Sequence, residues 1–151
     1  MLDIDEMGQK EIHEFLQQVG YGHLGYIHEG KPYVMPMRYY IQDSDIYMFT
    51  TEGMKTHDMD VNPEICLQVE KIHNPLHWRS VIVSGQAKRL TEQPEIDRAL
   101  QFIKGINPTL SPAINRTWID SAGRAEVVII YRIHPSEMTG RTTEGISSQP
   151  S

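Results

Sequence analysis

Residues 49–56 read Phe-Thr-Thr-Glu-Gly-Met-Lys-Thr, at the point where a strand-like run gives way to a helical segment closed by Pro63. The first turn of a helix has unpaired N–H groups and the positive end of the helix dipole, so a phosphate group fits there. The candidate phosphate ligands are Thr50, Thr51, Lys55 and Thr56. Without a ligand, Thr51 would instead cap the helix and Lys55 would be a solvated surface residue.

Strand-like segments lie on both sides of this stretch. Their alternating or continuous apolar character predicts six strands, over residues 21–28, 33–42, 46–51, 64–70, 78–90 and 125–133. Amphipathic patterns predict helices over residues 12–19, 54–62 and 96–103. Short spacing between the strands predicts a mainly β fold, a β-barrel with peripheral helices. We expect one domain over residues 1–140 and a mobile C-terminal tail over residues 141–151, with residues 106–124 forming a loop.

The composition excludes several classes of protein. A chain of 151 residues with a net charge of −6 lacks the basic character of a general nucleic-acid binder. No stretch is apolar enough for a membrane span or a signal sequence, so we expect a cytoplasmic protein. The single Cys66 lies in an apolar run, and we expect a buried free thiol. His73 and His77 are interpreted as loop histidines, and no metal site is expected.

Two further stretches have residue types that suit a ligand. Pro36 lies inside a predicted strand, and this favours an edge strand. Either the proline only protects that edge against aggregation, or a planar ligand bonds the free backbone groups of the edge. The residues of this stretch are Val34, Met35, Pro36, Met37, Arg38 and Tyr39. In the second stretch, Arg79 suits a phosphate and Ser80 a ring heteroatom. Alternatively, Trp78 is a packing anchor and Arg79 a surface ion-pair partner.

The three stretches, in this order and together with Gly22–Gly25, resemble the pyridoxamine 5′-phosphate oxidase-like superfamily of FMN-binding split barrels. The resemblance extends from about Gly20 to Leu90. It implies a six-stranded split barrel and a homodimer with two FMN (flavin mononucleotide) sites at the subunit interface. The shorter branch of the superfamily, which includes nitroimidazole-resistance proteins, is the more similar one.

The resemblance also implies roles for individual residues. The strand from Val34 to Tyr39 would run beside the isoalloxazine ring, and Thr50 and Thr51 would lie near the ribityl chain and phosphate. Lys55 and Thr56 occupy the place of a basic pair that holds the phosphate, although Thr56 is not basic. Arg79 and Ser80, beside Trp78, would reach the flavin from another strand. The C-terminal Trp and Arg segment of the true oxidase has no counterpart, so pyridoxamine phosphate oxidation is not expected.

The expected function is therefore an FMN-dependent oxidoreductase that passes electrons from NADH or NADPH to a small acceptor, such as a nitro compound or a quinone. No catalytic residue is assigned; Tyr39 and His77 are the candidate proton donors. One alternative is a protein that stores or senses flavin or haem without turnover, with His73 or His77 as the axial haem ligand. Another is a dimeric interaction module. The last predicted strand is apolar on both faces, which predicts that a second subunit covers one of them.

Overall fold

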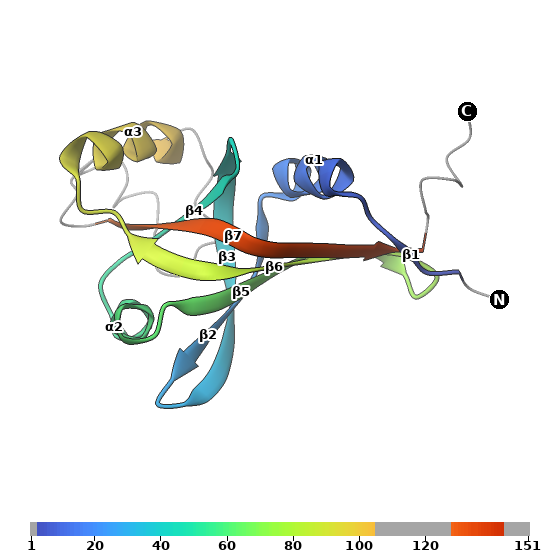
Figure 1. Cartoon of the computed structure of the whole chain (residues 1–151), viewed down its shortest axis with the longest axis horizontal. Helices are drawn as coiled ribbons and strands as arrows, with labels where there is room; N and C mark the ends of the chain where they lie inside the picture. The colour runs from blue at the N-terminus through green and yellow to red at the C-terminus, as the bar shows by residue number, and fades with distance from the viewer. Residues whose placement is uncertain (1–2, 105–127, 144–151) are drawn as a thin grey trace.

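The protein is described here by a computed structural model, which covers residues 3–104 and 128–143 and is mainly β (Figure 1). The helices are α1 (Gln9–Val19), α2 (Met54–Val61) and α3 (Gln93–Lys104). The strands are β1 (Asp5–Glu6), β2 (Tyr21–His28), β3 (Lys31–Gln42), β4 (Asp45–Thr50), β5 (Glu64–Asn74), β6 (His77–Arg89) and β7 (Ile129–Thr142). The sequence therefore predicted six of these strands, and missed the short β1.

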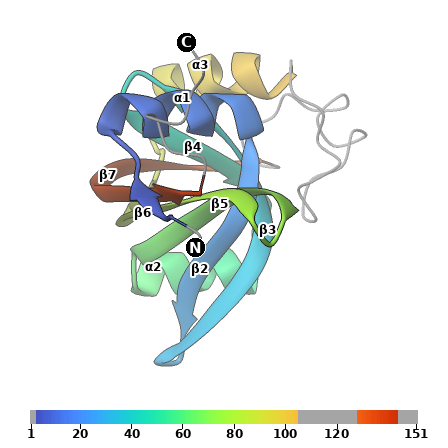
Figure 2. The same cartoon turned by 90° about the vertical axis from the view of Figure 1, so that its right-hand side faces the viewer.

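Six antiparallel strands close into a barrel. The order along the sheet is β7-β4-β3-β2-β5-β6, and β6 pairs back onto β7 over a long ladder from Arg79↔Thr142 to Arg89↔Tyr131. The short β1 adds to the outer edge at the far end of β7. The strands wrap around a common interior (Figure 2). Inward-facing apolar residues of the six strands fill this interior. The predicted β-barrel with peripheral helices is confirmed.

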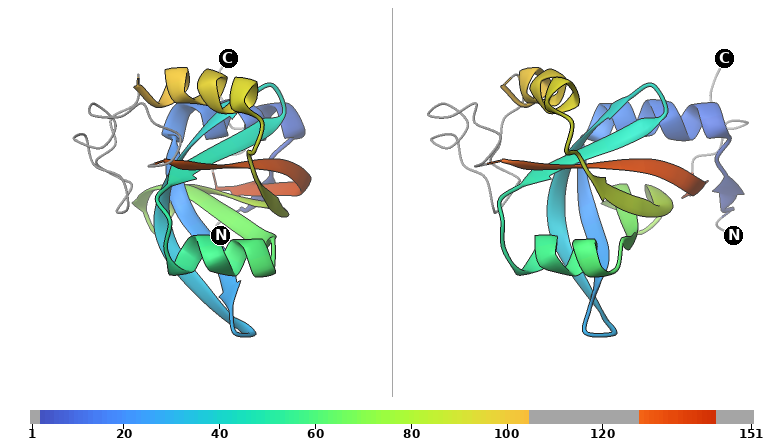
Figure 3. Two further views of the ribbon diagram at one scale, coloured as in Figure 1. Left: turned by 90° about the vertical axis from the view of Figure 1, so that its left-hand side faces the viewer. Right: turned by 60° about the vertical axis from the view of Figure 1, so that its left-hand side comes forward.

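Each helix covers a different part of the barrel (Figure 3). Apolar residues of α1, including Phe15 and Leu16, and Met59 of α2 join the barrel core. The third helix, α3, packs on the outside, where Leu100 meets Val128 and Ile130. The outer apolar face of β7 is thus covered by α3 of the same chain. The expectation that this face needs a second subunit is wrong.

The barrel is split between β3 and β4. These strands pair only from Tyr39↔Met48 to Gln42↔Asp45, whereas β3 pairs with β2 along its other edge as far as Lys31. Residues 31–38 of β3 therefore have no strand partner on the side of the split among the described residues. The predicted edge strand is confirmed.

Three local expectations differ from the structure. Residues 71–77 are not a loop, because β5 and β6 continue as a paired ribbon joined at Asn74↔His77. The ribbon has few inward apolar residues because it extends past the barrel core. Strand β7 runs to Thr142, so it includes the first two residues of the expected tail; residues 144–151 and the expected loop 106–124 lie outside the described residues. Cys66 is exposed rather than buried, because its neighbours in β5, Ile65 and Leu67, take the inward positions.

Candidate functional site

The turn from β4 into α2 is closed by its own residues. Gly53 is the N-cap residue of α2, in an extended conformation with no side chain to bond the helix. Thr56 supplies the missing cap, because the Gly53 N–H donates to Thr56 Oγ1 at 2.9 Å and the Thr56 hydroxyl donates to the Gly53 carbonyl oxygen at 2.8 Å. The hydroxyl of Thr56 therefore makes its hydrogen bonds inside the turn. Thr51, the capping residue of the ligand-free interpretation, is not the N-cap.

Lys55, in the first turn of α2, is a partly buried cation. Among the described residues no carboxylate forms an ion pair with it. Burial lowers the pKa of the Lys55 ammonium group from 10.5 to about 8, because a charge in a poorly solvated place is disfavoured. A bound anion would reverse this penalty. Lys55 is thus suited to a phosphate at the start of α2.

The two threonines at the end of β4 lie on the side of the split opposite β3. Thr50 is 2 % exposed, and its Oγ1 has no hydrogen-bond partner among the described residues. A buried hydroxyl without a partner is costly, and a polar ligand would relieve that cost. Thr51 is partly buried and follows directly. Because the β3–β4 ladder ends at Tyr39↔Met48, Thr50 and Met37 come next on the two sides of the opening.

The candidate residues of β3 present different groups to the split. Val34 is 69 % exposed, Pro36 is exposed and Met35 is partly buried, whereas Met37 and Tyr39 belong to the barrel core. The Tyr39 hydroxyl donates to the Leu16 carbonyl oxygen at 2.7 Å, and burial raises the pKa of Tyr39. Tyr39 therefore does not suit the role of a proton donor.

Arg38 lies beside these residues, on the outward face of β3. It is partly buried, and this burial lowers the pKa of its guanidinium. Its Nε is buried without a partner among the described residues. This nitrogen is a free donor close to the split.

Within one chain, the structure does not bring the candidate residues of β6 to the β4–α2 turn. Arg79 lines a small cavity beside α1, together with Lys71 and His73. Arg89, which does reach the turn, lies ten residues further along β6, or about 30 Å of strand. Ser80 Oγ accepts a hydrogen bond from Gln68 Nε2 at 3.1 Å.

The two remaining residues of the β6 end add little to a site within one chain. Trp78, next to Arg79, is partly buried. The exposed His77 is 3.1 Å from Asn74 Oδ1 at the tip of the β5–β6 ribbon. Neither residue reaches the β4–α2 turn. The tip of the ribbon is even further from this turn along β6 than Arg79 is.

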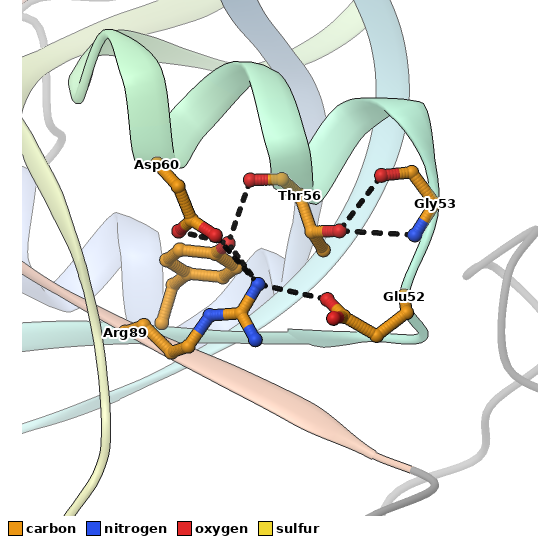
Figure 4. Close-up of polar contacts among 6 residues, drawn as sticks. Glu52, Gly53, Thr56, Asp60 and Arg89 are labelled. Carbon is orange, nitrogen blue, oxygen red and sulfur yellow. Dashed lines mark hydrogen bonds and ion pairs between the residues drawn. The ribbon is translucent and has the colours of Figure 1, made fainter.

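A polar network that the sequence patterns did not predict anchors the β4–α2 turn (Figure 4). Arg89 Nη2 donates to Glu52 Oε1 at 2.8 Å and to Asp60 Oδ2 at 2.7 Å. The Tyr131 hydroxyl lies 3.1 Å from the Thr56 carbonyl oxygen and 2.9 Å from Asp60 Oδ1. The hydrogen bond from Arg89 lowers the pKa of the Glu52 carboxyl. Arg89 and Tyr131 are far in sequence from Glu52 and Asp60, and no local pattern marks the four side chains as a group.

A second contact that the sequence patterns did not predict ties α2 to the β2–β3 hairpin. His28 Nδ1 is 2.7 Å from Oδ1 of the buried Asp58, and this hydrogen bond raises the pKa of His28. Tyr33 packs edge-on against the His28 ring, with the ring centroids 5.5 Å apart. The described residues contain no group of three or more His, Cys, Asp or Glu side chains that could hold a metal ion. None of the described helices has the length and apolar character needed to cross a membrane.

Comparison with solved structures finds proteins of the same fold. A structure described as a FAD-binding protein from Mesorhizobium loti has a TM-score of 0.73 at 23% identity, covering 94% of this chain and 98% of that one. A putative 5-nitroimidazole antibiotic resistance protein from Bacteroides thetaiotaomicron has a TM-score of 0.68 at 19% identity, covering 93% and 89%.

Similarity in sequence agrees with the similarity in structure. A curated relative, an uncharacterized protein of Rhizobium meliloti, is 31% identical over 62 residues, which is 41% of each chain. The family model described as pyridoxamine 5′-phosphate oxidase matches residues 8–142, which include the barrel, the split and the β4–α2 turn. The chain belongs to the pyridoxamine 5′-phosphate oxidase family.

Proposed function

We propose that this protein binds FMN in a homodimer and passes electrons from NADH or NADPH to a small acceptor, such as a nitro compound or a quinone. Family membership supports a flavin ligand, as do the relatives described as FAD-binding and as a nitroimidazole resistance protein. The observation that carries the proposal for FMN is Lys55, a partly buried cation at the start of a helix, without a carboxylate partner among the described residues. Riboflavin has no phosphate to offer this residue.

The residues on the two sides of the split fit the parts of FMN. Lys55 and the first-turn N–H groups of α2 would hold the phosphate, with Thr50 and Thr51 beside it. The free edge of β3 would offer backbone N–H and C=O groups to the polar edge of the ring. When bound, the flavin supplies the redox chemistry, and the protein contributes binding, orientation and access.

A second subunit is supported by an uncovered face of the barrel. Tyr21, Val34, Ile72 and Ile82 are 46%, 69%, 58% and 46% exposed. The strand registers put all four on the outer face of the β3-β2-β5-β6 sheet, of which α3 covers only the end of β3 at Tyr40. Polar residues such as Gln68 and Glu70 lie between them, and a second copy of the chain packed on this face would bury the four apolar side chains.

The proposal is tested by the absorbance spectrum of the purified protein and by anaerobic reduction. We expect the double band of a flavin, released as FMN rather than FAD on denaturation, and bleaching of this band by excess NADH or NADPH. An added nitro compound or quinone should then restore the band. A Soret band would indicate haem instead. Bleaching by dithionite but by neither nicotinamide would contradict the reductase and leave a flavin-storing or flavin-sensing protein.

A further inference from the structure

Two residues of the barrel wall hold the turn that carries Lys55. Arg89, at the end of β6, and Tyr131, on β7, are direct cross-strand neighbours, and both reach α2. We propose that Arg89 and Tyr131 are positioning residues that set the preference of the site for a phosphorylated flavin. The inference rests on the proposed FMN function and gives these residues a role that is separate from ligand contact.

The geometry fixes α2 on both sides of Lys55. Through one nitrogen, Arg89 bonds Glu52, three residues before Lys55, and Asp60, five residues after it. Tyr131, which is fully buried, bonds the Thr56 carbonyl oxygen in the first turn of the same helix. The start of α2 therefore cannot shift or rotate without breaking contacts to two barrel strands. A lysine is a flexible point charge, so its contact with a phosphate depends on the place of its backbone.

Charge gives Arg89 a second effect. Glu52 immediately precedes the N-cap of α2, where its carboxylate would repel an approaching phosphate. The guanidinium of Arg89 neutralises this carboxylate and holds it at 2.8 Å. Burial alone would lower the pKa of Arg89, but its hydrogen bonds to Glu52 and Tyr131 outweigh this and raise it, so the guanidinium stays charged. Loss of Arg89 would leave Glu52 free beside the phosphate position.

Loss of a network that only stabilises the fold and loss of one that positions Lys55 would both lower the melting temperature. The test therefore measures ligand selectivity. The apo forms of wild type, Arg89→Met and Tyr131→Phe are titrated with FMN and with riboflavin. Arg132→Met is the matched control. Arg132 follows Tyr131 on β7, is about as exposed as Arg89, and forms an ion pair with Glu95 of α3 at 2.8 Å. We expect the ratio of FMN to riboflavin affinity to fall about tenfold in Arg89→Met, the scale of one charge-assisted hydrogen bond, with riboflavin affinity unchanged.

Three further results are expected. Tyr131→Phe lowers the ratio in the same direction, and because it removes a single oxygen it supports the test if Arg89→Met does not fold. Adding Glu52→Gln to Arg89→Met recovers part of the ratio, because the repelling carboxylate is gone. In a Lys55→Met background, loss of Arg89 lowers the ratio less than it does in wild type, since no cation remains to be positioned and only the repulsion by Glu52 is left.

Each other outcome has a definite meaning. Equal weakening of FMN and riboflavin, or a lower melting temperature with an unchanged ratio, would overturn the inference and make the network a structural tie only. A wild-type protein that binds flavin but prefers neither FMN nor riboflavin would overturn the proposed phosphate site, and the inference with it. The two failures are therefore distinguished by the wild-type titration alone.

Discussion

Lys55→Met should stabilise the apo protein and weaken FMN binding at the same time. The pKa of Lys55 falls from 10.5 in the unfolded chain to about 8 in the folded one, so its charged form opposes folding. At 1.36 kcal/mol per tenfold change in proton affinity, this corresponds to at most about 3.5 kcal/mol. Because the side chain is only partly buried, solvent reduces the cost to about 1–2 kcal/mol. The unfolded chain binds more protons between pH 8 and 10.5, so this cost disappears as the pH rises through that range.

The affinity should change in the opposite direction. Lys55 donates one charge-assisted hydrogen bond to the phosphate, worth about 1.5–3 kcal/mol, so Lys55→Met should weaken FMN binding about ten- to a hundredfold. Riboflavin affinity should stay unchanged. In wild type, FMN binding should weaken as the pH rises above about 8, where Lys55 loses its proton.

Thermal melts of the apo proteins and fluorescence titrations at pH 7 measure both effects. For a chain of this length, a gain of 1–2 kcal/mol raises the melting temperature by about 2–8 °C. Lys10→Met, at an exposed position of α1, is the control and should change neither quantity. If Lys55→Met also leaves both the melting temperature and the FMN affinity unchanged, Lys55 is a solvated helix residue and the reasoning is refuted.

Three other predictions follow from the fold and the proposed dimer. Arg79→Ala should weaken FMN binding, and mixing it with Lys55→Met chains should regenerate one intact site per heterodimer; no recovery would mean that the two residues do not serve a shared site. Gly22→Ala should destabilise the barrel by about 1–3 kcal/mol in denaturant unfolding, because a Cβ there would collide with a backbone carbonyl of β5, whereas Gly8→Ala meets nothing within 4 Å. Because the pKa of His28 is raised above 6.5, its stabilisation is fully present below pH 6.5 and lost as the pH rises through the folded pKa. The difference in unfolding free energy between wild type and His28→Asn should therefore shrink as the pH rises from 6.5, and a constant difference would contradict this.

The sequence predicted the barrel because its strands are alternating or continuously apolar where they meet the core. Strand β2 has the predicted bounds, Tyr21–His28, and α2 differs from its prediction by one residue. The prediction failed where strands leave the core. The β5–β6 ribbon and the second half of β7 have few apolar residues and no regular alternation, so their pattern is that of a loop. They are strands because each pairs with a neighbour.

For the candidate site, local sequence identified the β4–α2 turn and the edge strand but not what supports them. Lys55 stands out by residue type next to a glycine turn, but its partly buried state depends on the packing of α2 against the barrel. Arg89 and Tyr131 are 42 positions apart and meet only because β6 pairs with β7. The apolar residues of β7 also could not show whether α3 of the same chain or a second subunit covers them.

The most direct test of the account is calorimetric titration of the wild-type apo protein with FMN and with riboflavin, at pH 7 and in the same buffer. The two ligands share the isoalloxazine ring and ribityl chain and differ only in the phosphate. The account predicts that FMN binds at least about tenfold more tightly, and that Lys55→Met removes most of the difference. Equal affinity of the wild-type protein for the two ligands would contradict a phosphate site at the β4–α2 turn.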